Sequence, residues 1–131
     1  MKKRISTVLA LLVLAVFLFA ACGGSKSYTI ELPGNPTTGY AWEYTAAPEG
    51  IVRETANDYA QAKGTEDTAG AGGTFSFTFE GANAGDTTLT FSYLRSWEEE
   101  GPVATVDISL SVDANGNIKE TARTESGDMP G

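Results

Sequence analysis

The chain has 131 residues, with 17 acidic and 9 basic side chains, one cysteine and no histidine. The missing histidine excludes Ser-His and Cys-His nucleophile pairs and imidazole metal ligands, and the single cysteine excludes an intrachain disulfide and a cysteine-based zinc or iron–sulfur centre. Three of the nine basic residues lie at positions 2–4, so from Cys22 onward six basic residues stand against 17 acidic ones, a net charge of −11 that argues against nucleic acid as a partner.

The first 21 residues have the pattern of a signal peptide. Lys2, Lys3 and Arg4 precede residues 8–21, a run without a polar group. Because a membrane-spanning helix needs roughly 20 apolar residues, this run is too short for a span and is typical of a secretory leader. It ends in Phe19-Ala20-Ala21-Cys22, which resembles a bacterial lipobox with Phe19 where leucine is usual.

Cys22 is therefore predicted to be lipidated and to become the first residue of the mature protein, with a flexible tether up to residue 27. Acyl chains anchor a protein stably, since each buried CH₂ contributes about 0.8 kcal/mol. We expect an exported protein held by its lipid at the cell surface or at the periplasmic face of the membrane. The alternative is ordinary signal cleavage nearby, which leaves a free thiol at Cys22.

The rest of the chain alternates apolar and polar side chains with a period of two, which is typical of strands with one buried face. The alternation is clear in residues 28–32, 75–79, 88–93 and 106–112. Shorter strand candidates are residues 41–44, 51–55 and 118–123, and residues 58–63 are the only candidate helical turn. About seven short strands predict an all-β fold, an immunoglobulin-like antiparallel β-sandwich. We expect one monomeric domain over residues 28–123 and a disordered polar tail over residues 124–131.

Strand parity places three loops at one end of this sandwich, because each strand crosses it once and loops separated by two strands leave from the same end. These loops are Asn35-Pro36-Thr37-Thr38-Gly39-Tyr40, Gly70-Ala71-Gly72-Gly73, and a third that begins Arg95-Ser96-Trp97 and continues with Glu98, Glu99 and Glu100. A rigid sandwich that presents loops at one end is a layout typical of recognition.

Each loop allows a binding role or a purely structural one. Pro36 and Gly39 suit a stiff turn whether or not the first loop binds anything. The glycine loop is either a backbone that a partner approaches closely or a flexible connector. Trp97 in an acidic loop has the character of an interface hot spot, unless its indole folds back as a lid on the core. Trp42, two residues after Tyr40, is expected in the core.

In this order and at this spacing, the three loops resemble those of chagasin-type inhibitors of papain-like cysteine proteases. Residues 35–40 followed by Trp42 look like the first motif of that family, and residues 70–73 followed by Phe75 look like its second. Arg95-Ser96-Trp97 is similar to the third motif, which usually reads Arg-Pro-Trp. Ser96 therefore replaces a proline that would stiffen this loop. The resemblance covers roughly residues 28–112.

The resemblance implies a reversible, competitive inhibitor whose three loops enter the active-site cleft of a protease as a wedge. The first loop would lie over the catalytic cysteine of the protease. The glycine loop and Trp97 would contact the two walls of the cleft, with Arg95 bracing its own loop. No residue of this chain would perform chemistry, and neither a metal nor a cofactor is implied. The implied partner is a papain-like cysteine protease, endogenous or foreign.

Three other functions remain open from the residues alone. An enzyme with paired carboxylates would draw on residues 98–100, but consecutive glutamates on a loop point in different directions, whereas retaining glycosidases hold two carboxyls about 5 Å apart. A surface-anchored adhesion or structural module with no protease target would share the same fold. Calcium binding at residues 113–117 is the third, although Asn115-Gly116 is better explained as a hairpin turn, because an EF-hand needs its glycine at position six.

Overall fold

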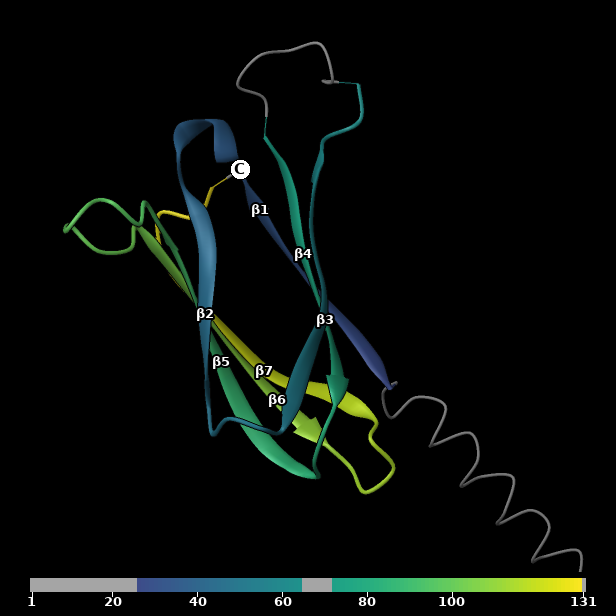
Figure 1. Ribbon diagram of the computed structural model, residues 1–131. Coiled ribbons are helices and arrows are strands. Elements are labelled where there is room, and N and C mark those ends of the chain that lie inside the picture. Colours follow the sequence, from purple (N-terminus) through teal and green to yellow (C-terminus); the bar gives the residue numbers. More distant parts are fainter. Residues whose placement is uncertain (1–25, 65–71, 131) are drawn as a thin grey trace, which may run out of the picture.

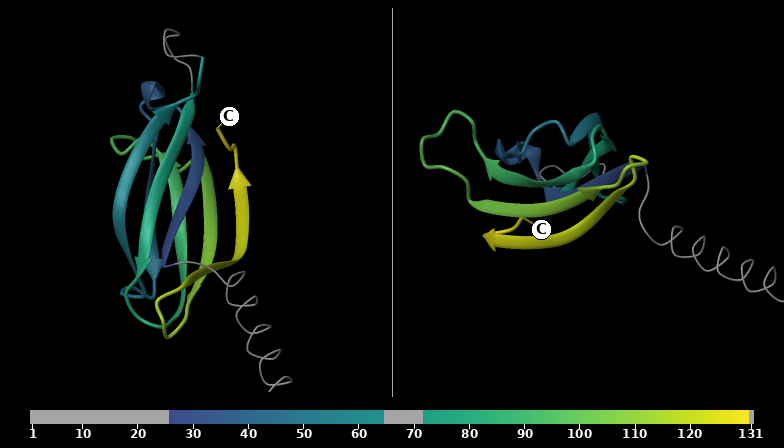
Figure 2. Two further views of the ribbon diagram at one scale, coloured as in Figure 1. Left: turned by 90° about the vertical axis from the view of Figure 1, so that its right-hand side faces the viewer. Right: turned by 90° about the horizontal axis from the view of Figure 1, so that it is seen from below.

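The computed structural model describes residues 26–64 and 72–130, which form seven strands and one 3-10 turn. These elements are β1 (Ser27–Gly34), the turn η1 (Pro36–Thr38), β2 (Ala41–Ala47), β3 (Val52–Gln61), β4 (Gly73–Gly81), β5 (Gly85–Leu94), β6 (Ala104–Val112) and β7 (Ile118–Gly127). They build two antiparallel sheets, ordered β1-β4-β3 and β2-β5-β6-β7. The sheets pack as two layers (Figures 1 and 2), which confirms the expected immunoglobulin-like sandwich.

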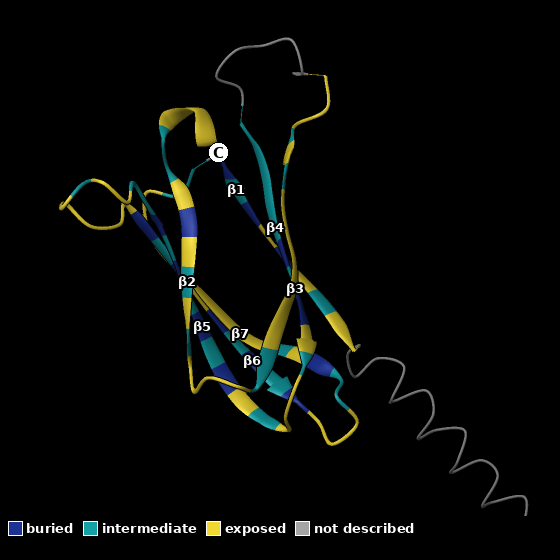
Figure 3. Cartoon of the chain, viewed as in Figure 1, coloured by how far each residue is buried: buried dark blue, intermediate teal, exposed yellow. Residues whose placement is uncertain are grey.

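The core lies between the two sheets and follows the period of two in the sequence. In β5, Leu89, Phe91 and Tyr93 are buried, and the residues between them are only partly buried. Ile30 of β1 and Phe77 of β4 meet them from the other sheet. Figure 3 shows the buried residues as dark blue bands along the strands. Burial of these apolar side chains is the main stabilising contribution to the fold.

The strand expected over residues 51–55 is present as the first part of β3, whereas the candidate helical turn over residues 58–63 is wrong, because the strand continues through it. β3 runs to Gln61 and pairs with β4 along its whole length. The register shifts between Glu54 and Ala56, and such a bulge interrupts the period of two. β3 is also an edge strand with mostly exposed side chains, so its far half carries no apolar alternation.

The expected disorder of residues 124–131 is wrong for most of that segment. β7 continues to Gly127, which pairs with Ala104 of β6. The N–H of Asp128 then donates to the carbonyl oxygen of Val103 at 2.8 Å, and Met129 packs against the core. β7 has one buried side chain, Ile118, so backbone pairing with β6 defines this strand and an apolar pattern does not.

The turn between β6 and β7 is a hairpin turn, as Asn115-Gly116 suggests. The carboxylate of Asp113 accepts the N–H groups of Asn115 and Asn117, both at 2.9 Å, and Gly116 has a φ of +85°. The hydrogen bond from the Asn117 backbone is the main reason that the pKa of Asp113 lies below its ordinary value. The carboxylate thus closes the turn. Within residues 26–64 and 72–130, no group of three Cys, Asp or Glu side chains is arranged to hold a metal ion.

The predicted leader and the predicted lipidation site at Cys22 lie outside the described residues. Among the residues that the structure does describe, no helix is long and apolar enough to cross a membrane. β1 begins at Ser27, at the end of the sandwich opposite η1 (Figure 1). A tether that precedes Ser27 therefore joins the domain at the end away from the predicted binding loops.

Candidate functional site

The described parts of the three loops lie at one end of the sandwich, as strand parity predicts. η1 follows β1, Gly72 and Gly73 lie at the start of β4, and the segment after β5 begins with Arg95 (Figure 1). Gly70 and Ala71 lie outside the described residues. A β-carbon at Gly72 would stand 3.2 Å from the carbonyl oxygen of Gly34, so the glycine loop lies against the backbone that leads into the first loop.

The first loop is a closed turn. Asn35 caps η1, because its side-chain oxygen accepts the N–H of Thr37 at 3.1 Å. Its carbonyl oxygen accepts both the N–H of Thr38 at 3.2 Å and the Thr38 hydroxyl at 2.6 Å. Gly39 ends the turn with a φ of +87°, and its N–H donates to Pro36 at 2.9 Å. Pro36, Thr37 and Thr38 are left exposed on a stiff support.

Aromatic side chains attach this turn to the sandwich. The hydroxyl of Tyr93 accepts the N–H of Asn35 at 2.8 Å, and the Tyr93 ring stacks on Tyr40 with centroids 5.3 Å apart. The indole N–H of Trp42 donates to the carbonyl oxygen of Pro33 at 2.9 Å. Trp42 is buried, which confirms its expected place in the core. The exposed turn therefore rests on buried, hydrogen-bonded rings.

Arg95 attaches the third loop to the first. Its Nε donates to the carbonyl oxygen of Thr38 at 2.9 Å, and its guanidinium carbon lies 4.4 Å from the centroid of the Tyr40 ring. Nη1 forms an ion pair with Glu98 at 2.9 Å. The hydrogen bond to Glu98 is the main cause that raises the pKa of Arg95 above its ordinary value. Arg95 thus holds two loops together.

Trp97 is the most exposed large apolar side chain of the described residues, with 69% of its surface accessible. This exposure overturns the alternative in which the indole covers the core. The indole lies against Gly39, where a β-carbon would stand 2.6 Å from Cη2 of Trp97. Ser96 is exposed beside it. The first and third loops therefore form one surface, and the exposed indole of Trp97 is part of it.

Gly73 has a structural reason to be glycine. A β-carbon there would lie 2.2 Å from the carbonyl oxygen of Ala60 and 2.6 Å from the hydroxyl of Tyr59. This close approach fixes the start of β4 against the end of β3. At Gly73 the glycine serves packing inside the molecule, whatever else the loop contacts.

Two residues of the site are missing from the sequence-based prediction. Tyr93 fits the alternation of β5, so the pattern indicates only a core residue and does not reveal that its hydroxyl holds Asn35. Glu98 is the first of three consecutive glutamates, which indicates a solvated run, yet it pairs with Arg95. The contact of Tyr93 depends on how the first loop meets β5, whereas Glu98 pairs with Arg95 within one loop, three residues away.

The family model of the chagasin family of peptidase inhibitors, I42, matches residues 24–112, more than half of the chain and all three loops. The chain belongs to this family. As a chagasin-family peptidase inhibitor, it is not an enzyme, and the kind of partner that it binds is a cysteine protease.

The crystal structure of a cysteine protease inhibitor from Entamoeba histolytica is similar to this chagasin-family chain, with a TM-score of 0.58 and 23% identity over 66% of this chain and 78% of that chain. This likeness is one of fold. The solution structure of amebosin matches with a TM-score of 0.45 and 23% identity, over 79% of this chain and 80% of that one. The comparison with curated proteins found no match.

Proposed function

We propose that this chain inhibits papain-like cysteine proteases reversibly and competitively, by filling the active-site cleft with η1, the glycine loop and the loop that carries Trp97. The observation that carries the proposal is the bracing of the exposed turn. Tyr93 holds its start, Gly39 closes its end, and Arg95 holds its side. A preformed wedge loses little conformational entropy when it enters a groove, so more of its contact energy appears as affinity.

The same hydrogen bonds explain how such a turn would occupy a protease without being cut. The carbonyl oxygens of Asn35, Pro36 and Thr38 already accept hydrogen bonds from within the protein. A scissile carbonyl must instead face the attacking thiolate and the donors that stabilise its oxyanion. Because the turn is helical and its carbonyls are engaged, it would block the thiolate without presenting a bond for cleavage.

Trp97 would supply the largest apolar contact. Its indole is exposed before binding and already packs against Gly39. It would therefore contact a cleft wall without a prior rearrangement of the core. The glutamates that follow it, Glu99 and Glu100, are exposed at the same edge. They would favour proteases whose cleft rim is positively charged, mainly through the association rate.

We also propose that the protein is exported and is anchored through a lipid on Cys22. The sequence before residue 28 supports this, and the position of Ser27 opposite η1 makes it compatible with inhibition. Lipid at Cys22 would hold the far end of the domain to a membrane and leave the three loops facing away from it. A Cys22→Ala variant should lose incorporation of labelled fatty acid and leave the membrane fraction, and labelling that survives in this variant would contradict the assignment.

The inhibitor proposal is tested with residues 23–131, which contain every strand of the described core. Papain is assayed with a fluorogenic peptide at several substrate concentrations. We expect the apparent KM to rise with inhibitor concentration while the maximal rate stays constant. We also expect the inhibitor to remain a single intact band after long incubation with the protease, for the reason given by the engaged carbonyls.

A matched pair of variants separates specific occlusion from a general effect of added protein. Trp97→Ala should raise the inhibition constant by about 30-fold to several hundredfold, which corresponds to about 2–4 kcal/mol for a hot spot. Asn115→Ala, at the opposite end of the sandwich, should leave it unchanged. The proposal fails if micromolar protein leaves papain active, or if the rate loss is independent of substrate concentration.

A further inference from the structure

The chain continues beyond the part that the family model matches, and this continuation returns to the loop end. The match ends at residue 112, before β7. β7 pairs with β6 from Ile118 opposite Val112 to Gly127 opposite Ala104. It therefore runs the length of the sandwich and brings the C-terminal segment to the end at which η1 lies (Figures 1 and 2).

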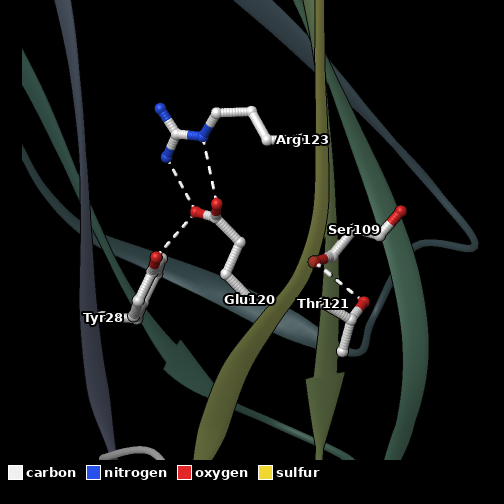
Figure 4. Close-up of polar contacts among 5 residues, drawn as sticks. All are labelled: Tyr28, Ser109, Glu120, Thr121 and Arg123. Carbon is white, nitrogen blue, oxygen red and sulfur yellow. Dashed lines mark hydrogen bonds and ion pairs between the residues drawn. The ribbon is translucent and has the colours of Figure 1, made fainter.

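Side chains and backbone groups hold this continuation in place. Ile118 is buried at its start. Further along, Glu120 accepts the hydroxyl of Tyr28 on β1 at 2.6 Å and forms a bidentate pair with Arg123, with contacts of 2.7 and 3.1 Å (Figure 4). The hydrogen bond from Tyr28 joins β7 to the edge of the other sheet, and Arg123 holds the Glu120 carboxylate within β7. At the loop end, the N–H of Asp128 donates to Val103. The position of the C-terminal segment is thus built into the fold.

The last described residue, Pro130, forms part of a hollow between the first loop and the glycine loop. This hollow has a volume of about 480 Å³ and is lined by Gly34, Asn35, Ala62, Gly72, Gly73, Thr74 and Pro130. Its lining combines the small apolar surfaces of Ala62 and Pro130 with the backbone of three glycines. Met129, just before Pro130, packs against the core.

We propose that Pro130 is a fourth contact element of the inhibitory end, and that the hollow beside it receives an apolar side chain from the cleft rim of the target cysteine protease. This inference rests on the proposed function. Asn35 lines the hollow and also caps η1, so a protease seated on Pro36 is one residue away from the hollow. The hollow is therefore continuous with the proposed interface.

The chemistry of the hollow fits an apolar guest. Glycine backbones permit close approach, and the pyrrolidine ring of Pro130 is a stiff apolar wall that loses little conformational freedom on binding. Charged groups of the neighbouring loops, such as Glu99 and Glu100, are not among the residues that line it. A charged side chain on either partner would be desolvated here without an opposite charge, which disfavours binding.

Two variants of residues 23–131 test the inference against papain. A chain that ends at Met129 removes Pro130 and keeps the core contact of Met129. Pro130→Glu places a carboxylate at the hollow, and Ala122→Glu adds the same charge on an exposed part of β7 away from the loop end. We expect the first two to raise the inhibition constant on the order of tenfold with an unchanged melting temperature, and Ala122→Glu to leave it unchanged.

The outcomes separate this inference from the function on which it rests. If the parent chain inhibits papain and both Pro130 variants inhibit equally well, the C-terminal contact is wrong and three-loop inhibition stands. If Ala122→Glu weakens inhibition as much as Pro130→Glu, general charge repulsion explains the effect and the contact is again wrong. If the parent chain itself does not inhibit, the proposed function falls and this inference falls with it.

Discussion

The indole of Trp97 lies directly against the backbone of Gly39, so that a β-carbon on Gly39 would stand 2.6 Å from Cη2 and 2.9 Å from Cζ2 of the indole. Gly39 belongs to the first loop and Trp97 to the third, and the four strands β2 to β5 lie between them in the chain. This contact couples the end of η1 to the most exposed apolar side chain of the described residues. The proposed inhibitory surface is therefore one unit, because the first and third loops are in direct contact.

Gly39→Ala should disrupt this coupling. The new methyl group would displace the indole, and the φ of +87° at this position is strained for any residue with a β-carbon. We expect an inhibition constant raised by at least about tenfold and a free energy of unfolding lowered by about 1 kcal/mol. Titration of papain and urea unfolding measure the two effects.

Gly116→Ala is the matched control for that variant. Gly116 has a φ of +85°, lies at the opposite end of the sandwich, and has no atom within 4 Å of its added β-carbon. It should show the same loss of stability with full inhibition. Equal loss of inhibition in both variants would mean that strain, and not the position of Trp97, governs binding.

Arg95 is expected to act mainly by positioning the loops. Arg95→Ala removes the hydrogen bond to Thr38 and the contact with Tyr40, so inhibition should weaken more than about tenfold. Glu98→Gln keeps a hydrogen-bond acceptor beside Arg95 and removes only a partly exposed ion pair, so inhibition should change less than about threefold. A larger effect of Glu98→Gln than of Arg95→Ala would contradict this role.

The hydroxyl of Tyr93 provides a test of how the first loop is held. Tyr93→Phe keeps the buried ring and removes the contact with the N–H of Asn35. We expect a loss of about 1 kcal/mol in stability and severalfold weaker inhibition, because the turn is less firmly held. Tyr44→Phe removes a hydroxyl that donates to Glu54 on the side of the sandwich, and it should leave the inhibition constant unchanged. The two variants are compared by unfolding and by papain titration.

The contact between β1 and β7 predicts an acid-dependent stability. The hydrogen bonds from Arg123 are the largest cause that keeps the pKa of Glu120 below its ordinary value of 4.5, against the opposing effect of burial, and the hydroxyl of Tyr28 lowers it further. A carboxyl group whose pKa is lower in the folded state stabilises the fold above its unfolded pKa. That contribution is lost as the pH falls through the folded value.

Glu120→Gln should therefore be less stable than the parent at pH 7, and the difference should shrink at pH 3, where the parent carboxylate is becoming protonated. Urea unfolding at both values measures this. Glu80→Gln is the control, because its pair with Arg53 is exposed on both sides and contributes little at either pH. A difference for Glu120→Gln that is as large at pH 3 as at pH 7 would show that shape, and not charge, holds β7.

The contact between Tyr28 and Glu120 also predicts a loss of stability at alkaline pH. Burial is the main cause that raises the pKa of Tyr28 from 10.0 to about 12, and the hydrogen bond to Glu120 adds to it. Because the folded state disfavours the ionised phenol, the contribution of Tyr28 is full below pH 10 and is lost as the pH rises toward 12. Tyr28→Phe should remove this part of the alkaline loss of stability in unfolding measurements between pH 9 and 12.

The sandwich could be predicted from the sequence where a strand has one buried face. Leu89, Phe91 and Tyr93 alternate with polar residues, and β5 lies where this pattern indicates. The far half of β3 and the end of β7 could not be predicted, because these edge strands bury few side chains and are defined by backbone pairing, with a register shift in each pairing. At a register shift one strand has an extra residue, so the alternation of buried and exposed side chains is interrupted there.

For the site, strand parity was sufficient to bring the loops to one end, whereas the sequence left open whether Trp97 is exposed or covers the core, and the structure shows it exposed. Strand parity does not predict which residues of the loops contact one another. The hydrogen bond from Arg95 to Thr38 and that from the N–H of Asn35 to Tyr93 each join residues more than fifty positions apart. Such contacts depend on side-chain directions in the folded protein, so they become visible only with the structure.

We propose that the loops occupy the protease cleft without forming a bond to its thiol. Calorimetric titration of residues 23–131 into papain whose catalytic cysteine is replaced by serine, and into papain whose cleft is blocked by a covalent peptidyl inhibitor, tests this mode of binding. We predict tight, saturable binding to the serine enzyme and none to the blocked enzyme. Equal binding to both enzymes would place the contact outside the cleft and rule out occlusion by the three loops.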